Sequence, residues 1–441
     1  MVISKAGQPG ARPGVICSRF HARDGAPPCS IGSSPGNNVL PSPARVCCPE
    51  PSQQVVQPAL STRMDHLPDD VLLVVMSHLR TWDLFSCRLV CKRFAPLALH
   101  PEVWRHRNLW EPFNRDYVNV LFCPVLRLAP CLDDLRITLP SPHTCHSLFT
   151  GPCATKRLYI EIREPSGAAQ AALLIRHQRE LGRLKGIHLH LLDEQSGLRP
   201  EFSVADTSVL FGTVVSTPGL HYLDISPAGD ELLPIKSSPR WLHPTIEASM
   251  TDFSCPWSPA LEHFFNCMLA VHAASLEVVE MREYTFEFNS PSTVALLAQL
   301  PALVELFCSV FPGMEALAEC ATLRHIHLEI NPQKDHVRAY APAAASFLRR
   351  ARQLRTLQLK YEDEGDVGVE LITALASSGR SGVEVLRIDY DPCDIEAHLP
   401  ELLGALASLP ALRRLIVNVE KDSPHAQKIL AATSSIQVEF K

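Results

Sequence analysis

A six-residue aliphatic phrase recurs along this chain and constrains its fold more than any other feature. The phrase reads Leu-x-x-Leu-x-Leu, with other aliphatic residues at some positions. From Leu276 onward the copies start 27, 20, 31, 29 and 29 residues apart. Such a period indicates a solenoid, in which each unit packs only on its neighbours. The copies are Leu132-x-x-Leu135-x-Ile137, Thr155-x-x-Leu158-x-Ile160, Leu184-x-x-Ile187-x-Leu189, Leu220-x-x-Leu223-x-Ile225, Leu276-x-x-Val279-x-Met281, Leu303-x-x-Leu306, Leu323-x-x-Ile326-x-Leu328, Leu354-x-x-Leu357-x-Leu359, Val383-x-x-Leu386-x-Ile388 and Leu412-x-x-Leu415-x-Val417.

Amphipathic stretches with helical spacing lie between these phrases. They span residues 168–181, 292–300, 343–353, 369–377 and 396–409. Proline follows Leu300 and Leu409 at two near-identical joints, where it ends a helix and starts an extended segment. A short strand followed by a helix, repeated, predicts an α/β solenoid over residues 120–441. A plain α+β domain is the alternative.

The period and phrase resemble those of leucine-rich repeats, and the resemblance implies an irregular horseshoe. The Asn or Cys that the family has three positions after the last Leu is met only by Asn331. Between Leu220 and Leu276 at least one unit is degenerate, with Thr245-x-x-Ala248-x-Met250 as a possible copy. The Pro- and Trp-containing stretch 227–259 is expected to be a loop insertion on one face.

Residues between the aliphatic positions of each phrase should point away from the core, because side chains alternate along a strand. Side by side, they form a surface that mixes charged and aromatic residues. Such a surface suits a protein or peptide better than a polyanion, although few of its residues will dominate binding. The residues that we expect to contact a target are Tyr159, His188, Tyr222, Arg282, Phe307, His327, Lys360 and Arg387.

Residues 64–110 predict a small helical domain. Leu67-Pro68-Asp69-Asp70 is a helix start, with proline at the entry and two acids near the positive helix end. Residues 71–79 are apolar around most of the helix circumference, Thr81 can cap a second helix, and a third is expected over residues 89–97. Three short helices cannot enclose that much apolar surface, so the domain should have a partner.

The order and spacing of these residues resemble an F-box. The matching blocks are Leu67-Pro68-Asp69-Asp70, Leu72 to Leu79, Asp83-Leu84, Val90-Cys91-Lys92-Arg93-Phe94 and Trp104. Asp70 stands where Glu is usual and Phe94 where Trp is common. The resemblance implies docking on the Skp adaptor of a Skp–cullin–F-box ubiquitin ligase. The residues expected to dock are Leu67, Pro68, Leu72, Val75, Leu79, Leu84, Val90, Phe94 and Trp104.

The first 63 residues differ from the rest of the chain. They are rich in Pro and Gly, lack large aliphatic runs and contain six basic and two acidic residues. This composition predicts a disordered tail of charge +4, which leaves −10 for the remainder of a chain of net charge −6. Met64 stands directly before the ordered pattern, and we expect translation to be able to start there. Peptides from residues 1–63 in the native protein would contradict that expectation.

Catalytic, metal-binding and membrane-spanning patterns are weak in this sequence. The pairs His188 with His190 and His325 with His327 lack a third ligand at a fixed offset. Cys123, Cys131, Cys145 and Cys153, with His143 and His146, are spaced unlike a zinc site. No signal peptide, apolar span or strongly basic footprint is evident.

We therefore expect a cytoplasmic or nuclear protein with free thiols, and without a cofactor, metal, membrane or nucleic-acid partner. The predicted function is a non-catalytic substrate receptor of a cullin–RING ubiquitin ligase for an unidentified target. The alternatives are an adaptor-bound scaffold without ubiquitin transfer and a hydrolase in the Cys/His-rich region 123–153.

Overall fold

The computed structural model divides the chain into two units, residues 1–62 and 63–441. Only parts of the second unit are described below, so the predicted disordered tail lies outside the described residues. The described ranges are 67–110, 121–140, 145–191, 203–227, 246–282, 288–331, 333–361, 367–390, 399–433 and 436–440.

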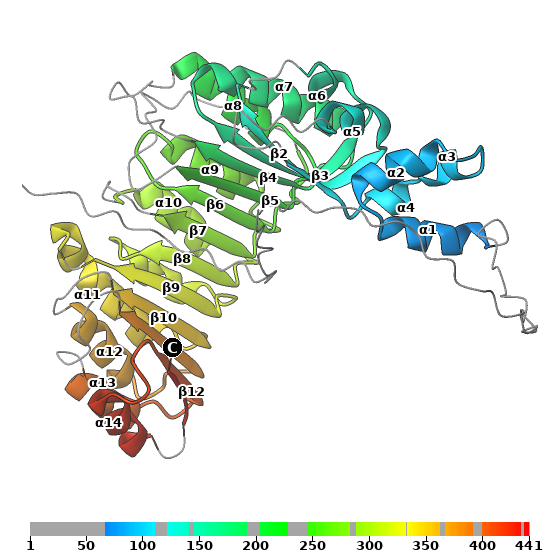
Figure 1. Cartoon of the computed structure of the whole chain (residues 1–441). Helices are drawn as coiled ribbons and strands as arrows, with labels where there is room; N and C mark the ends of the chain where they lie inside the picture. Colours follow the sequence, from blue (N-terminus) through cyan, green and yellow to red (C-terminus); the bar gives the residue numbers. More distant parts are fainter. Residues whose placement is uncertain are drawn as a thin grey trace, which may run out of the picture. The chain divides into compact units, whose positions relative to one another are not determined.

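The described residues form one parallel sheet of thirteen strands, arranged in the order in which they occur along the chain (Figure 1). Each strand is therefore hydrogen-bonded to its neighbours in sequence, as stacked repeats require. The strands are β1 Asn108–Trp110, β2 Cys131–Leu139, β3 Ala154–Ile162, β4 Gly186–Leu191, β5 Tyr222–Pro227, β6 Asp252–Pro256, β7 Val278–Arg282, β8 Glu305–Ser309, β9 His325–Ile330, β10 Thr356–Tyr361, β11 Val385–Tyr390, β12 Arg414–Val417 and β13 Gln437–Phe440.

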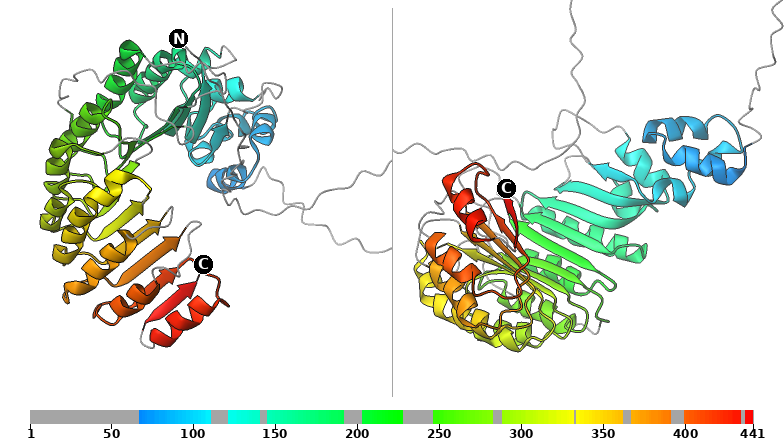
Figure 2. Two further views of the ribbon diagram at one scale, coloured as in Figure 1. Left: turned by 90° about the vertical axis from the view of Figure 1, so that its left-hand side faces the viewer. Right: turned by 90° about the horizontal axis from the view of Figure 1, so that it is seen from below.

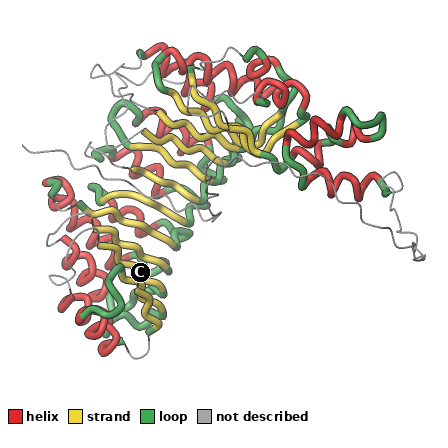
Figure 3. The backbone as a smooth tube through the Cα atoms, in the orientation of Figure 1, coloured by secondary structure: helices red, strands yellow, loops and turns green. Residues whose placement is uncertain are grey.

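Helices from α7 to α14 lie along one face of this sheet, and the other face carries no helix within the described ranges (Figures 2 and 3). We call that second face the open face. The helices are α1 Asp69–Ser77, α2 Thr81–Arg88, α3 Phe94–Leu97, α4 Pro101–Trp104, α5 Phe122–Leu128, α6 Ser147–Thr150, α7 Ser166–Glu180, α8 Val204–Val215, α9 Glu262–Val271, α10 Pro291–Ala298, the 3₁₀ helix η2 Met314–Glu319, α11 Asp335–Arg350, α12 Val367–Ser377, α13 Leu399–Leu406 and α14 Pro424–Ala432.

The aliphatic phrases supply the core between the sheet and these helices. In β9, Ile326, Leu328 and Ile330 are buried, while the residues between them are half-buried on the open face. Ile326 is paired with Leu357 of β10, so aliphatic residues of successive strands form continuous rows. The second and third positions of the predicted copies lie in strands, which confirms the mixed α/β prediction.

The sixth strand corrects two predictions about the degenerate unit. β6 contains Phe253 and Cys255, which are buried, as is Met250 just before the strand. These residues form the copy Met250-x-x-Phe253-x-Cys255, which begins five residues after the predicted Thr245. The core accepts Met, Phe and Cys where other repeats have Leu, because an apolar side chain of suitable volume can fill the position. The predicted loop insertion 227–259 therefore contains a strand in its second half, and residues 228–245 lie outside the described ranges.

Helix ends near the N-terminus also differ from prediction. Thr81 is the first residue of α2 rather than its cap, and the cap position is held by Arg80, which makes no side-chain capping bond. The third helix is shorter than the predicted 89–97, since α3 begins only at Phe94. Residues 89–93 form turns instead, which leaves Leu89 exposed on the surface.

Candidate functional site

Helix α1 begins at the predicted Leu-Pro-Asp-Asp motif. Pro68 occupies the cap position, and Asp69 and Asp70 lie in the first turn, where negative charge stabilises a helix. The Arg93 Nε donates a hydrogen bond to Asp69 Oδ1 at 2.9 Å. The same guanidinium donates to the carbonyl oxygen of Leu67, so the start of α1 is tied to the turn before α3.

Four of the nine predicted adaptor contacts form the core of this helical domain. Leu72 and Leu84 are 1 % exposed, and Phe94 and Trp104 are likewise buried. Trp104 donates from Nε1 to the carbonyl oxygen of Ala98 at 2.8 Å, which satisfies the one polar group of the indole. In this conformation the four side chains lie beneath the surface and pack the helices of the domain together. Their direct contact with an adaptor stays a prediction.

The other five predicted contacts reach the surface to different extents. Pro68, Val75 and Val90 are exposed, whereas Leu67 and Leu79 are half-buried. The structure thus separates the sequence motif into a buried set and an accessible set.

Exposed apolar side chains gather in the same short segment. Eleven large hydrophobic residues are exposed among the described residues, and six of them lie between residues 71 and 90. The six, which we call the F-box hydrophobics, are Val71, Val74, Val75, Trp82, Leu89 and Val90. Sequence reasoning chose only Val75 and Val90 from this set. The spacing of Val71, Val74 and Val75, three and four residues apart, places them on one helical stripe beside the buried one and could have revealed them.

The helical domain joins the sheet through its own last strand. β1 is paired with β2, and the Asp133 N–H donates to the carbonyl oxygen of Arg107 at 2.8 Å. Arg107 also donates from Nη2 to the carbonyl oxygens of Met76 and Ser77, at 3.1 and 3.0 Å, and so closes the end of α1. Burial lowers the pKa of this guanidinium from its usual value.

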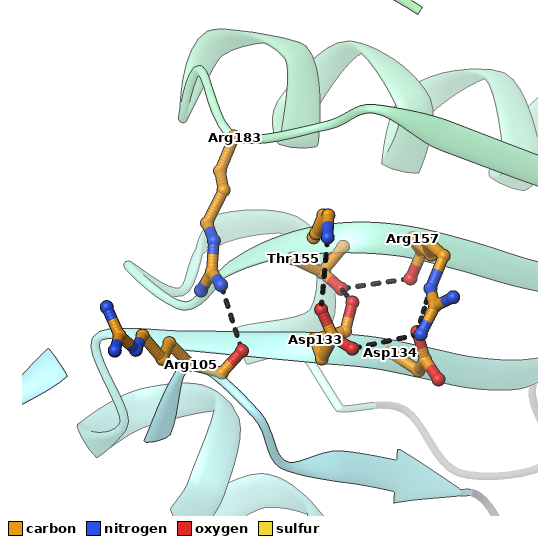
Figure 4. Close-up of polar contacts among 7 residues, drawn as sticks. Arg105, Asp133, Asp134, Thr155, Arg157 and Arg183 are labelled. Carbon is orange, nitrogen blue, oxygen red and sulfur yellow. Dashed lines mark hydrogen bonds and ion pairs between the residues drawn. The ribbon is translucent and has the colours of Figure 1, made fainter. Parts of the chain in front are cut away.

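A second arginine crosses the same junction from the loop before β4. Arg183 donates from Nη2 to the carbonyl oxygen of Arg105 at 3.0 Å (Figure 4). Beside it, Arg157 of β3 forms ion pairs with Asp133 and Asp134 of β2. The hydrogen bond to Asp134 raises the pKa of Arg157. The Arg183 side chain and the backbone pairing of β1 with β2 therefore hold the helical domain against the first strands.

The open face carries two groups of stacked rings. Tyr159 and His188 stack with centroids 4.0 Å apart and planes 12° apart, and Tyr222 packs on the other side of His188 at 4.5 Å. Phe307 and His327 stack in the same way, with centroids 4.0 Å apart. Burial, followed by the nearby Asp134 charge, raises the pKa of the Tyr159 hydroxyl. Strand register brings Tyr159 next to His188 and Phe307 next to His327, because each pair occupies equivalent positions on neighbouring strands. Tyr222 lies two residues before Asp224, the register partner of His188, and reaches the ring from there.

Charged residues of the open face are paired with one another. His327 Nε2 lies 2.8 Å from Glu305 Oε1, and Lys360 Nζ lies 2.6 Å from Glu329 Oε1. Arg387 forms an ion pair with Asp389 on the same strand.

The eight residues predicted to contact a target all lie on strands of this face. Arg282 ends β7 and its side chain is not described; the side chains of the other seven are half-buried. Target contact itself stays a prediction for all eight.

Metal and membrane sites find no support within the described ranges. No group of three or more His, Cys, Asp or Glu side chains that could hold a metal ion occurs among the described residues. Cys123 and Cys145 approach within 2.6 Å between sulfur atoms, while His143 of the same predicted cluster lies outside the described residues. None of the described helices is long and apolar enough to cross a bilayer.

Comparison with known families identifies the helical domain. Residues 64–110 match the F-box-like family, over the same residues that carry the exposed apolar side chains. The chain therefore contains an F-box-like domain followed by a thirteen-stranded parallel sheet with helices. A search of curated proteins finds no match for the chain.

Proposed function

We propose that this protein is the substrate-recognition subunit of a Skp–cullin–F-box ubiquitin ligase. The F-box-like domain docks the Skp adaptor, and the sheet domain binds a target protein. The chain itself makes and breaks no bond. It holds the target near a conjugating enzyme that the assembly recruits, so its contribution to catalysis is proximity.

The exposed apolar side chains of the F-box-like domain carry this proposal. Val74, Leu89 and Val90 are 60, 84 and 67 % exposed, although each could have been buried in a larger core. Burying such a side chain contributes roughly 1.5–3 kcal/mol, so several of them suffice for a stable interface. A helical domain with this surface is well suited to a permanent protein partner.

The target-binding half of the proposal rests on the repeat character of the sheet. Strands that succeed one another in order, ten of them built on the same aliphatic phrase, support the assignment as irregular leucine-rich repeats. Gln333 N–H donates to the Asn331 side chain at 3.0 Å, as expected of the turn asparagine in that family. Function in the cytoplasm or nucleus, where ubiquitin ligases of this class act, belongs to the same proposal.

Adaptor binding can be tested with substitutions that leave the core intact. The double variant Val74→Glu, Val90→Glu places two charges among the F-box hydrophobics and should weaken capture of the purified Skp adaptor at least about 100-fold. Leu173→Glu is the matched control, because Leu173 is 56 % exposed on α7, outside the F-box-like domain. Equal adaptor capture by the double variant and the control would rule out this docking surface.

A second measurement separates ligase from scaffold. The full chain, purified with the adaptor, should also bring down cullin and support ubiquitin transfer. Adaptor binding without cullin would favour the alternative, a scaffold that does not transfer ubiquitin.

A further inference from the structure

Acidic residues follow one another across the middle of the open face. Each of the strands β5 to β9 places one carboxylate at an outward position: Asp224, Asp252, Glu280, Glu305 and Glu329. Arg282 is the only Lys or Arg among the outward positions of the same strands. With histidines neutral, the central part of this face therefore carries a net charge of about −4.

The strands on either side have a different charge pattern. Basic residues occupy outward positions of β2, β3, β10, β11 and β12, in the form of Arg136, Arg157, Lys360, Arg387 and Arg414. Several of these are paired with acids nearby, as Arg157 is with Asp134 and Arg387 with Asp389. Acids thus outnumber Lys and Arg on the central strands, although Glu329 at their edge is paired with Lys360 of β10, whereas the two signs are more evenly matched on the outer strands.

A buried hydroxyl lies within the acidic row. Ser254 is in register with Asp224 on one side and with Glu280 on the other. It is 5 % exposed, and its Oγ has no hydrogen-bond partner in the described structure. A buried hydroxyl without a partner is costly, and a cationic N–H group arriving between the two carboxylates would supply one.

Stacked rings lie beside this row and within it. His188 is in register with Asp224, and Phe307 is in register with Glu280. His188 stacks with Tyr159 next to the first carboxylate, and Phe307 stacks with His327 on β8 and β9, the strands that also carry Glu305 and Glu329. Arg and Lys side chains combine favourably with such faces and with carboxylates.

We propose that the open face over β5 to β9 binds an extended, cationic segment of the target protein, rich in Lys or Arg. This inference rests on the proposed function, because it names the class of target segment that the receptor holds. Strands are spaced about 4.8 Å apart, so the acids span about 19 Å, the length of roughly six extended residues. Charge complementarity over that length would also speed encounter with the target.

The test measures binding of a fluorescent peptide to the full chain in complex with the adaptor. The probe is a peptide of about nine residues with alternating Lys and Ser, and its counterpart has Glu in place of Lys. The Lys peptide should bind and the Glu peptide should not. Raising NaCl from about 50 to about 300 mM should weaken the Lys peptide several-fold, because salt screens exposed charges.

A triple variant locates the binding site. Asp224→Asn, Glu280→Gln and Glu305→Gln together remove three charges from the open face while keeping side-chain size, and should weaken binding of the Lys peptide about tenfold. The charge-matched control is Glu180→Gln, Glu420→Gln, Asp422→Asn, three exposed acids outside the open face. It should change affinity less than about threefold. Thermal unfolding of both triples checks that the fold is retained.

Two outcomes would overturn the inference. One is equal weakening by the two triple variants, which would mean that the whole acidic chain attracts the peptide. The other is equal binding of the Lys and Glu peptides. Neither outcome touches the proposed function, which instead fails if the unsubstituted chain does not bind the adaptor or cullin.

Discussion

The F-box-like domain and the sheet domain bury similar residues in their cores, but their surfaces differ in polarity. Leu72 and Leu84 of the former and Leu357 and Leu386 of the latter are all at most 1 % exposed. Outside the core, the F-box-like domain leaves seven large hydrophobics accessible, the six F-box hydrophobics and Trp110, whereas the outward positions of the sheet are mainly charged, polar or aromatic. The contrast suggests a partner that stays bound at one end and a partner that comes and goes at the other.

Size explains part of this difference. A domain of about 45 residues has too little volume to bury all its aliphatic side chains, whereas stacked repeats bury a continuous core. The short domain therefore depends on its few large core residues more than any single repeat does.

The largest expected effect is the loss of stability on removing a large core residue of the F-box-like domain. Replacing Trp104 with Ala removes a fully buried indole and its hydrogen bond to Ala98, and should destabilise the F-box-like domain by about 3–5 kcal/mol. Calorimetry should resolve an early transition for this domain while the sheet unfolds near its original temperature. A single transition shifted as a whole would mean that the two regions unfold as one unit.

The second largest expected effect is a pH dependence of stability, caused by a buried histidine of the sheet domain. His272 is 1 % exposed, and its Nδ1 accepts hydrogen bonds from the backbone N–H groups of Ser249 and Met250. Burial lowers its pKa from 6.5 to about 4. As the pH falls, this histidine is therefore protonated in the unfolded chain before it is protonated in the folded protein. Its contribution to the free energy of unfolding is complete above pH 6.5 and is lost as the pH falls towards 4. The loss should reach about 3 kcal/mol.

Denaturant unfolding at several pH values checks this expectation. The variant His272→Asn keeps a short acceptor side chain but cannot titrate, so the difference in unfolding free energy between the two proteins should shrink as the pH falls. A difference that is constant between pH 7 and pH 4 would contradict the assignment.

The smallest effect concerns the open face. Lys360 and Glu329 form an ion pair whose side chains are 43 and 35 % exposed, so Lys360→Gln should cost less than about 1 kcal/mol of stability. Chemical denaturation in parallel with the unsubstituted protein measures it. A cost above about 2 kcal/mol would show that this charge pair supports the fold and would weaken the contrast between the two surfaces.

Local pattern was enough to predict the F-box-like domain and ten of the thirteen described strands, but not β1, β6 and β13. The aliphatic phrase specifies a period-two core face, and the Leu-Pro-Asp-Asp motif specifies a helix start, so each can be recognised without knowledge of its neighbours. The sixth strand was misplaced because Phe253 and Cys255 stand where aliphatic residues were sought. The four-residue helix α3 was overextended at its N-terminal end, because the apolar pattern already begins at Leu89, within the turns that precede the helix.

Contacts between distant segments were beyond the reach of the sequence. Gln178 of α7 accepts from the Thr155 N–H at 2.8 Å and donates to the carbonyl oxygen of Cys153 at 3.1 Å, and nothing in its local sequence indicates this role. The bond from Arg183 to Arg105 joins residues 78 positions apart. Which apolar side chains of the F-box-like domain are exposed likewise depends on which faces of its helices pack together.

The last strand of the sheet has a consequence for solubility. β13 is at the end of the strand order and pairs with β12 alone among the described strands. Unpaired strand edges are templates for aggregation, which proteins limit with short strands and charged residues. β13 has only four residues, and its Glu439 is held by an ion pair with Arg414. A truncation that removed β13 would transfer the edge to β12, whose Leu415, Ile416 and Val417 are a continuous apolar run.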